Sequence, residues 1–85
     1  MPQVELLDFY ADWCGPCQQM KPVIEELEKE LKDVKFTKIN VDENQAEAQK
    51  YNVMSIPTFI IKKDGKVSDQ LNGAQPKDIL INKLK

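Results

Sequence analysis

Histidine is absent from this chain of 85 residues, and cysteine occurs only twice. A zinc site would therefore need carboxylates beside two thiolates, a ligand set that suits zinc poorly, and we expect neither a metal nor any other cofactor. No run of residues approaches the roughly 20 apolar positions that a membrane span requires. The first residues, Met1-Pro2-Gln3, lead into a short strand pattern rather than into the apolar stretch of a secretory signal. These absences predict a cytoplasmic protein with no membrane partner.

The chain also lacks a large excess of charge of one sign. It has 12 basic and 14 acidic residues, and its net charge is -2. Lysine and glutamate alternate along the chain, so no basic face is available for nucleic acid. The length suits one small domain over residues 1–85, because single domains usually hold about 100 residues. With 41% hydrophobic residues, we expect a folded globular domain and a monomer.

The apolar pattern predicts four strands and three helices. The strands are expected at residues 4–10, 35–41, 56–61 and 66–71. A long amphipathic helix should run from about Cys14 to Lys32, with Glu28 among the residues of its polar side. A short helix should follow a cap at Asp42 or Asn44, and a last helix should begin near Pro76 and turn Ile79, Leu80 and Leu84 inward.

The order βαβαββα predicts an α/β fold with one four-stranded mixed sheet and helices on both faces. The first strand, the long helix and the second strand form a right-handed crossover between parallel strands. Asp64-Gly65 is a strong hairpin signal between the last two strands. The first strand is nearly all apolar and should be central, whereas Lys35 and Lys38 suit a second strand at the edge of the sheet.

The two cysteines, Cys14 and Cys17, stand two residues apart where the first strand gives way to the long helix. A disulfide between them would close a loop too short to restrain the unfolded chain strongly, and a helix N-terminus lowers the pKa of a thiol. Redox chemistry is therefore the favoured interpretation. The alternative is a pair of buried cysteines with a purely structural role.

Six stretches of the sequence resemble the thioredoxin family, and together they cover essentially the whole chain. They are residues 8–17, Pro22, residues 38–42, residues 55–58, Asp64-Gly65 and Gly73-Ala74. The chain departs from the family in starting where ordinary thioredoxins have their second strand, which implies the minimal thioredoxin fold. Gln18 stands where the family often has lysine, and Ser55 where glycine is commoner.

This resemblance implies a role for four residues. Cys14 becomes the exposed nucleophile and Cys17 the less exposed resolving thiol of a disulfide exchange. Asp8, beneath the site, becomes the acceptor of the Cys17 proton, because burial raises the pKa of a carboxyl group. The alternative is an acid that the strand merely tolerates. Lys38 is either the partner of Asp8 or a charge that protects the sheet edge.

The resemblance also implies a docking surface for an extended segment of a client protein. Pro57 is expected in the cis form opposite the cysteines, rather than as a trans proline of an edge strand. Gly73 is either part of the groove or an ordinary turn glycine, and Tyr10 is as readily core support as a contact. The residues expected to bind substrate are Trp13, Gly15, Pro16, Ile56, Pro57, Gly73 and Ala74.

The predicted function is that of a protein disulfide reductase, an electron-transfer oxidoreductase that contributes to redox homeostasis. Its expected partners are client proteins with disulfides and a reductant of the thioredoxin-reductase type. Three alternatives stay open: a glutaredoxin-like protein, an oxidase or isomerase, and a non-catalytic module that binds partners through the same fold.

Overall fold

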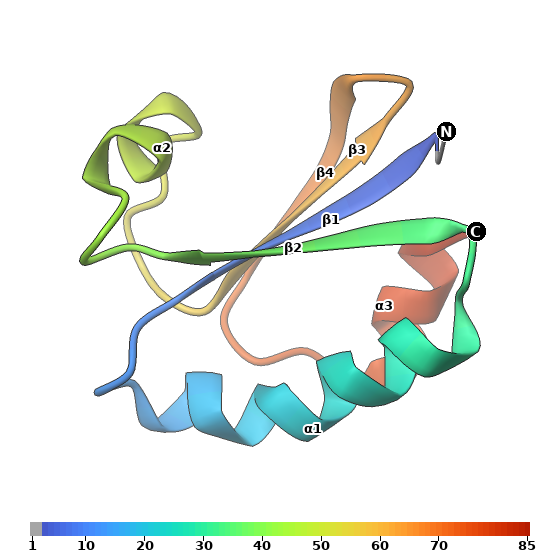
Figure 1. The fold of residues 1–85 in the computed structure, drawn as a ribbon, viewed down its shortest axis with the longest axis horizontal. Helices are drawn as coiled ribbons and strands as arrows, with labels where there is room; N and C mark the ends of the chain where they lie inside the picture. Colours follow the sequence, from blue (N-terminus) through green and yellow to red (C-terminus); the bar gives the residue numbers. More distant parts are fainter. Residues whose placement is uncertain (1–2) are drawn as a thin grey trace.

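The computed structural model describes residues 3–85, so Met1 and Pro2, with which the predicted domain begins, lie outside the described residues. The predicted order of elements is confirmed (Figure 1). The elements are β1 (Val4–Tyr10), α1 (Gly15–Glu30), β2 (Val34–Asn40), α2 (Gln45–Lys50), β3 (Thr58–Lys63), β4 (Lys66–Asn72) and α3 (Lys77–Leu84).

The strands form one mixed sheet in the order β2-β1-β3-β4. β1 pairs with β2 in parallel and with β3 in antiparallel orientation, and β4 completes the sheet beside β3. The predicted central place of β1 and edge place of β2 are therefore confirmed. Since β1 has a neighbour on both sides, its residues are held in fixed register with two strands.

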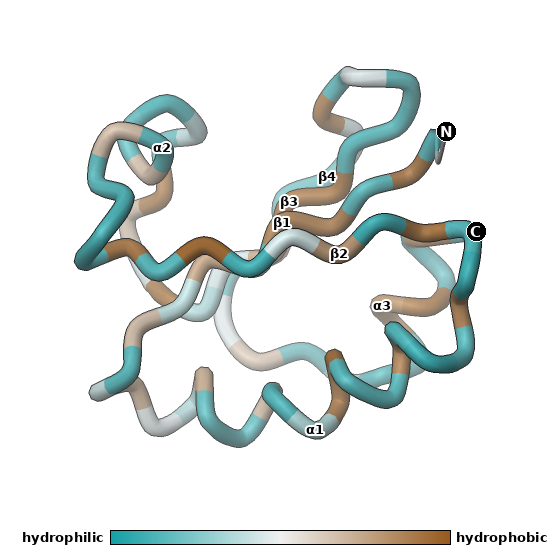
Figure 2. Tube along the Cα trace, in the orientation of Figure 1, coloured by the Kyte–Doolittle hydropathy of each residue, from teal (hydrophilic) through white to brown (hydrophobic). Residues whose placement is uncertain are grey.

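Alternation along β1 separates the two faces of the sheet. Leu6 joins a core with α1 and α3, whereas Leu7 and Phe9 join a smaller core against the segment around α2. Figure 1 shows α1 and α3 on one side of the sheet and α2 on the other. In Figure 2 the hydrophobic colour follows β1 and β3 through the middle of the molecule. Asp8 shares its face with Leu6 and so points toward α1.

Helix α1 packs on the sheet through one apolar stripe. Met20, Ile24 and Leu27 are buried at helical spacing. Cys14 is the N-cap, and the helix passes through Pro22 and ends at Glu30, two residues before the predicted end. Glu28, expected on the polar side, is half-buried and forms an ion pair with Lys38 of β2. The spacing within the helix predicts this side of α1 but not the strand that it meets.

The hairpin between β3 and β4 turns at Asp64-Gly65, where both residues have positive φ, 53° and 82°. These values match the two-residue turn that the sequence signal predicts. β3 begins at Thr58 instead of Ile56. The two preceding residues are joined by a cis peptide bond, and proline has no N–H group to donate to a neighbouring strand, so regular pairing starts after Pro57.

The two short helices depart from the prediction in detail. Asn44 precedes α2, but its side chain donates to the Asn40 carbonyl instead of capping the helix. In α3, Leu80 and Leu84 are buried as expected, whereas Ile79 is 37% exposed. The prediction for Ile79 was wrong because residues i and i+1 of a helix point in different directions, and Leu80 takes the inward one.

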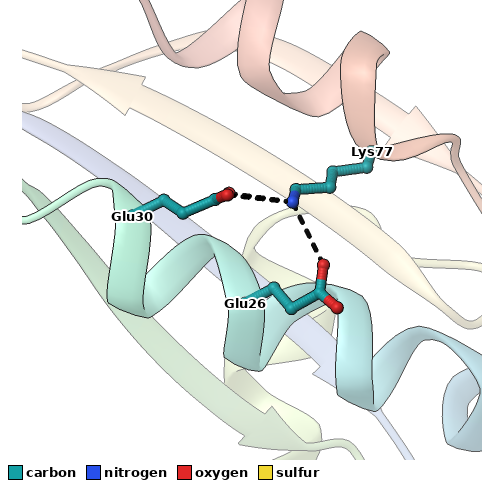
Figure 3. A network of polar contacts seen from close by, with 3 residues as sticks. All are labelled: Glu26, Glu30 and Lys77. Atoms are coloured by element: carbon teal, nitrogen blue, oxygen red, sulfur yellow. Dashed lines mark hydrogen bonds and ion pairs between the residues drawn. The ribbon is translucent and has the colours of Figure 1, made fainter.

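A charged network joins the two helices of the larger core. The Lys77 ammonium lies 3.1 Å from a carboxylate oxygen of Glu26 and 2.9 Å from one of Glu30 (Figure 3). The pKa of Lys77 is raised chiefly by its hydrogen bonds to Glu30 and Glu26. The network ties the start of α3 to the last turns of α1.

Over residues 3–85, every helix is too short or too polar to cross a membrane.

Candidate active site

The two cysteines are joined by a disulfide at the point where the chain enters α1. Their Cα atoms lie 5.2 Å apart. Cys14 is the N-cap and Cys17 lies in the first turn, so a single turn of helix holds both sulfur atoms. The sulfurs pack with Ala11, and Tyr10 and Ile56 close around them.

One backbone amide in the first turn of α1 donates to the sulfur of Cys14. The backbone N–H of Cys17 donates to Cys14 Sγ over 3.1 Å. A helix N-terminus carries a partial positive charge and favours an anion there. The helix N-terminus thus presents a hydrogen-bond donor to Cys14 Sγ, an environment that favours negative charge on that sulfur.

The expected difference in exposure between the cysteines is absent in this oxidised state. Cys14 is 5% exposed and Cys17 7%. The prediction of an exposed Cys14 was wrong for the disulfide form because the sulfur of the N-cap residue folds back over the first turn of the helix. In the disulfide form the two cysteines therefore differ in the hydrogen bond from the Cys17 amide to Cys14 Sγ rather than in exposure.

Asp8 lies beneath the disulfide and is 9% exposed. Burial raises its pKa from 3.8 to about 6, Lys38 opposes that rise, and Glu28 adds to it. Asp8 and Cys17 line one cavity of about 220 Å³. A carboxylate with this pKa in a space shared with Cys17 can take up a proton near neutral pH.

Lys38 stands directly opposite Asp8 in the register of β1 and β2. Its ammonium lies 3.5 Å from Glu28, and its side chain is 41% exposed. Both proposed roles of Lys38 thus have a structural basis: it acts on the charge of Asp8, and it is a partly exposed lysine on the edge strand.

A shallow groove of about 330 Å³ runs beside the disulfide. Trp13 forms one wall and is 71% exposed, and its indole N–H donates to Asp42 over 2.8 Å. Met54, 93% exposed, forms another wall. The groove is lined by Trp13, Val41, Ala48, Val53, Met54, Ser55 and Ile56. It therefore offers an apolar surface with one fixed aromatic ring.

The expected cis peptide bond between Ile56 and Pro57 is confirmed. Gly73 lies next to it, because the Gly73 N–H donates to the Pro57 carbonyl over 2.7 Å. Gly73 has a φ of 85°, and a Cβ added there would meet nothing within 4 Å. The turn conformation, rather than close approach of another backbone, is therefore what requires glycine there.

The other predicted docking residues lie at the surface. Gly15 and Pro16 are exposed at the start of α1, directly beside the disulfide. Ala74 is exposed and follows Gly73, so it is tied to the site only through that neighbour. All the predicted residues except Ala74 are thus joined by a contact or a shared cavity, or are direct neighbours of the cysteines in the chain.

The residues of the site that were not predicted include Glu28, Asp42 and Met54. Glu28 looks like an ordinary solvent-facing helix residue in the sequence. Asp42 was considered only as a helix cap, and Met54 stands in a segment without periodicity.

Within residues 3–85, no group of three or more cysteine or acidic side chains is arranged to hold a metal ion.

Comparison with known proteins places the chain in a broad set of relatives. A family model described as Thioredoxin matches residues 2–85. A thioredoxin from Bacillus subtilis is 54% identical over 78 residues, which span 91% of this chain and 75% of the relative. A thioredoxin from Chlamydia caviae is 50% identical over 89% of this chain and 74% of the relative.

The fold of this chain also matches the folds of solved thioredoxin structures. The oxidised form of mitochondrial thioredoxin 3 from Saccharomyces cerevisiae superposes with a TM-score of 0.92 at 36% identity, covering 99% of this chain and 78% of that one. A thioredoxin variant from Halobacterium salinarum also gives 0.92, at 45% identity over 96% of this chain and 72% of that one.

Proposed function

The chain belongs to the thioredoxin family, and from that premise we propose that it reduces protein disulfides through a mixed disulfide on Cys14 that Cys17 resolves. Family membership and the cysteine pair make it a disulfide oxidoreductase. The family needs no cofactor beyond the redox-active disulfide, and it implies disulfide-containing clients and a thioredoxin reductase as partners.

The reaction begins from the reduced dithiol. The Cys14 thiolate attacks one sulfur of the client disulfide, a bond forms between the two, and the second client sulfur leaves as a thiolate that takes up a proton. Cys17 then gives its proton to Asp8 and attacks the Cys14 sulfur. The Cys14–Cys17 bond forms, the mixed disulfide breaks, and the client leaves with two electrons gained. The reductase returns two electrons to the disulfide.

The observation that carries this proposal is the position of the disulfide between two complementary groups. The Cys17 amide at the helix N-terminus donates to Cys14 Sγ, and the Asp8 carboxyl shares a cavity with Cys17. One group favours an anion on the attacking sulfur, and the other accepts the proton of the resolving sulfur. A structural disulfide would need neither.

Docking of the client is assigned to the apolar groove and its rim. Trp13 and Ile56 supply apolar contacts, and the backbone beside Pro57 can pair with an extended segment of the client. Gly15 and Pro16 lie at the start of α1 beside the cysteines. Gly73 lies next to Pro57, and Ala74 follows Gly73 in the chain. The chain is further proposed to act as a single domain, as a monomer and in the cytoplasm.

The two cysteines can be tested separately in a disulfide reduction assay with insulin. Cys14→Ser should abolish turnover, because no mixed disulfide can form. Cys17→Ser should form the mixed disulfide with a client and hold it, so that a covalent complex is recovered without reductant. Turnover by Cys14→Ser equal to that of the unmodified chain would refute the proposal.

The source of electrons separates this function from its nearest alternatives. A thioredoxin reductase with NADPH should recharge the disulfide, whereas glutathione alone should do so far more slowly. Rapid recharging by glutathione would favour a glutaredoxin-like protein. Faster oxidation of a reduced client than reduction of an oxidised one would favour an oxidase, and partner binding unaffected in both cysteine variants would favour a binding module.

A further inference from the structure

Lys38 has two carboxylate residues as neighbours, and they come from different elements. Asp8 is its direct neighbour across β1 and β2, and strands of a sheet lie about 4.8 Å apart. Glu28 on α1 is the carboxylate with which Lys38 forms an ion pair, at 3.5 Å. One cation is therefore within reach of two anions, and its position decides which of them it neutralises.

We propose that Glu28 is a positioning residue for the proton acceptor, because it holds the Lys38 ammonium toward α1 and prevents a close ion pair between Lys38 and Asp8. The inference rests on the proposed role of Asp8 in the reaction. It assigns to Glu28 a function that a residue on the polar side of a helix would not have.

The position of the Lys38 ammonium matters because it affects how readily Asp8 takes up a proton. A cation in direct contact with a carboxylate favours the ionised form and makes it a weaker base. Here burial outweighs the attraction of Lys38, and the negative charge of Glu28 adds to the rise in the Asp8 pKa. With Glu28 in place, Asp8 stays able to receive a proton near neutral pH.

The ion pair itself contributes little to folding. The side chains of Lys38 and Glu28 are 41% and 39% exposed, and partly exposed pairs are weak because water screens them. Asp8 is buried, and charges act on a buried group with less screening. Removal of Glu28 should therefore act on the protein mainly through the titration of Asp8 rather than through the loss of the ion pair itself.

Among the groups around Asp8, Lys38 and Glu28 are the charged residues that act on it most strongly. β3 places the apolar Phe59 opposite Asp8. The remaining polar or titratable groups that line the shared cavity are Tyr10, Asp12, Cys17, Gln18 and Lys21. Lys21 is exposed on α1, and the causes of the shift in the Asp8 pKa, after burial, are Lys38 and Glu28.

The test is a direct titration of the Asp8 carboxyl by its carbon-13 chemical shift in the oxidised protein. Glu28→Gln keeps the shape of the side chain and should lower the pKa of Asp8 by about one pH unit, because Lys38 becomes free to approach it. Lys38→Met should raise that pKa. Glu25→Gln is the matched control, since it removes the same charge from an exposed position on the same helix, and it should leave the titration unchanged.

The double variant with Lys38→Met and Glu28→Gln separates positioning from a simple effect of charge. If Glu28 acts through Lys38, its replacement should have a clearly smaller effect when Lys38 is already gone. An equal effect in both backgrounds, an unchanged Asp8 titration in Glu28→Gln, or the same change in Glu25→Gln would each overturn the proposal.

A second measurement separates this proposal from the one on which it rests. The pH midpoint of the resolution step, followed as release of client from the mixed disulfide, should move with the pKa of Asp8 in each variant. If the Asp8 pKa moves as expected and the midpoint of the rate does not, Asp8 is not the proton acceptor, but the positioning by Glu28 stands.

Discussion

Replacement of Asp8 by asparagine should make the folded protein more stable at neutral pH while it slows the reaction. Burial raises the pKa of Asp8 from 3.8 to about 6. The ionised carboxylate is thus less favourable in the folded chain than in the unfolded chain, by about 3 kcal/mol at a pH above both values. The amide side chain of asparagine carries no charge and avoids this cost, so Asp8→Asn should gain up to about 3 kcal/mol at pH 8.

The sign and the pH range follow from the direction of the shift. Between pH 4 and pH 6 the folded chain binds more protons at Asp8 than the unfolded chain does, so the free energy of unfolding falls as the pH rises through this range. Below about pH 3 the carboxyl is largely neutral in both states, and the variant should approach the wild type. Above about pH 7 the difference should be constant.

Urea unfolding of the oxidised proteins at a series of pH values measures this difference. Urea adds no salt, so charge interactions are left unscreened, and equal slopes of the two unfolding curves would show that the variant unfolds like the wild type. The difference between the two proteins cancels the titration of the other carboxyl groups. A difference in unfolding free energy that is the same at pH 4 and pH 8 would refute the reasoning, because it would mean that Asp8 is ionised without cost.

Three further outcomes are expected. Leu80→Ala should lose about 2–5 kcal/mol of stability because a fully buried side chain is removed, whereas Ile79→Ala next to it should lose far less; equal losses in thermal or urea unfolding would contradict the packing of α3. Lys77→Met should lower the melting temperature slightly at low salt and by less at high salt, since its partners are exposed glutamates; the same loss at both salt concentrations would argue against a charge effect. Met54→Glu should raise the KM for a client with an apolar segment and leave kcat nearly unchanged, because it places a charge in the groove; an unchanged KM would show that clients dock elsewhere.

The sequence was sufficient to predict the order of elements and the parallel crossover, because those features follow from local patterns. The nearly continuous apolar run of β1, the amphipathic spacing of α1 and the Asp64-Gly65 turn each act within a few residues. The bounds of β3 were less accurate. The pairing of β3 depends on where Pro57 stops interfering with hydrogen bonds to neighbouring strands, and local patterns do not reveal this.

The features that the sequence did not predict arise between elements far apart in the chain. Glu28 acquires its role from Lys38 of another element, and Trp13 is held by Asp42, 29 residues away. Cys14 has low exposure because its side chain, at the N-cap, turns back toward the first turn of α1 and accepts from the Cys17 amide. No periodicity or spacing within a single element carries this information.

The hydrogen bond from the Cys17 amide to Cys14 Sγ couples the integrity of the helix to the oxidation state of the protein. In the disulfide, this amide is capped by a neutral sulfur, which is a weak acceptor. Reduction replaces that sulfur by a thiolate, and hydrogen bonds to a charged acceptor are stronger. Reduction also breaks the covalent link between Cys14 and Cys17, so the stronger hydrogen bond is expected to take over part of the restraint that the disulfide places on the first turn of α1.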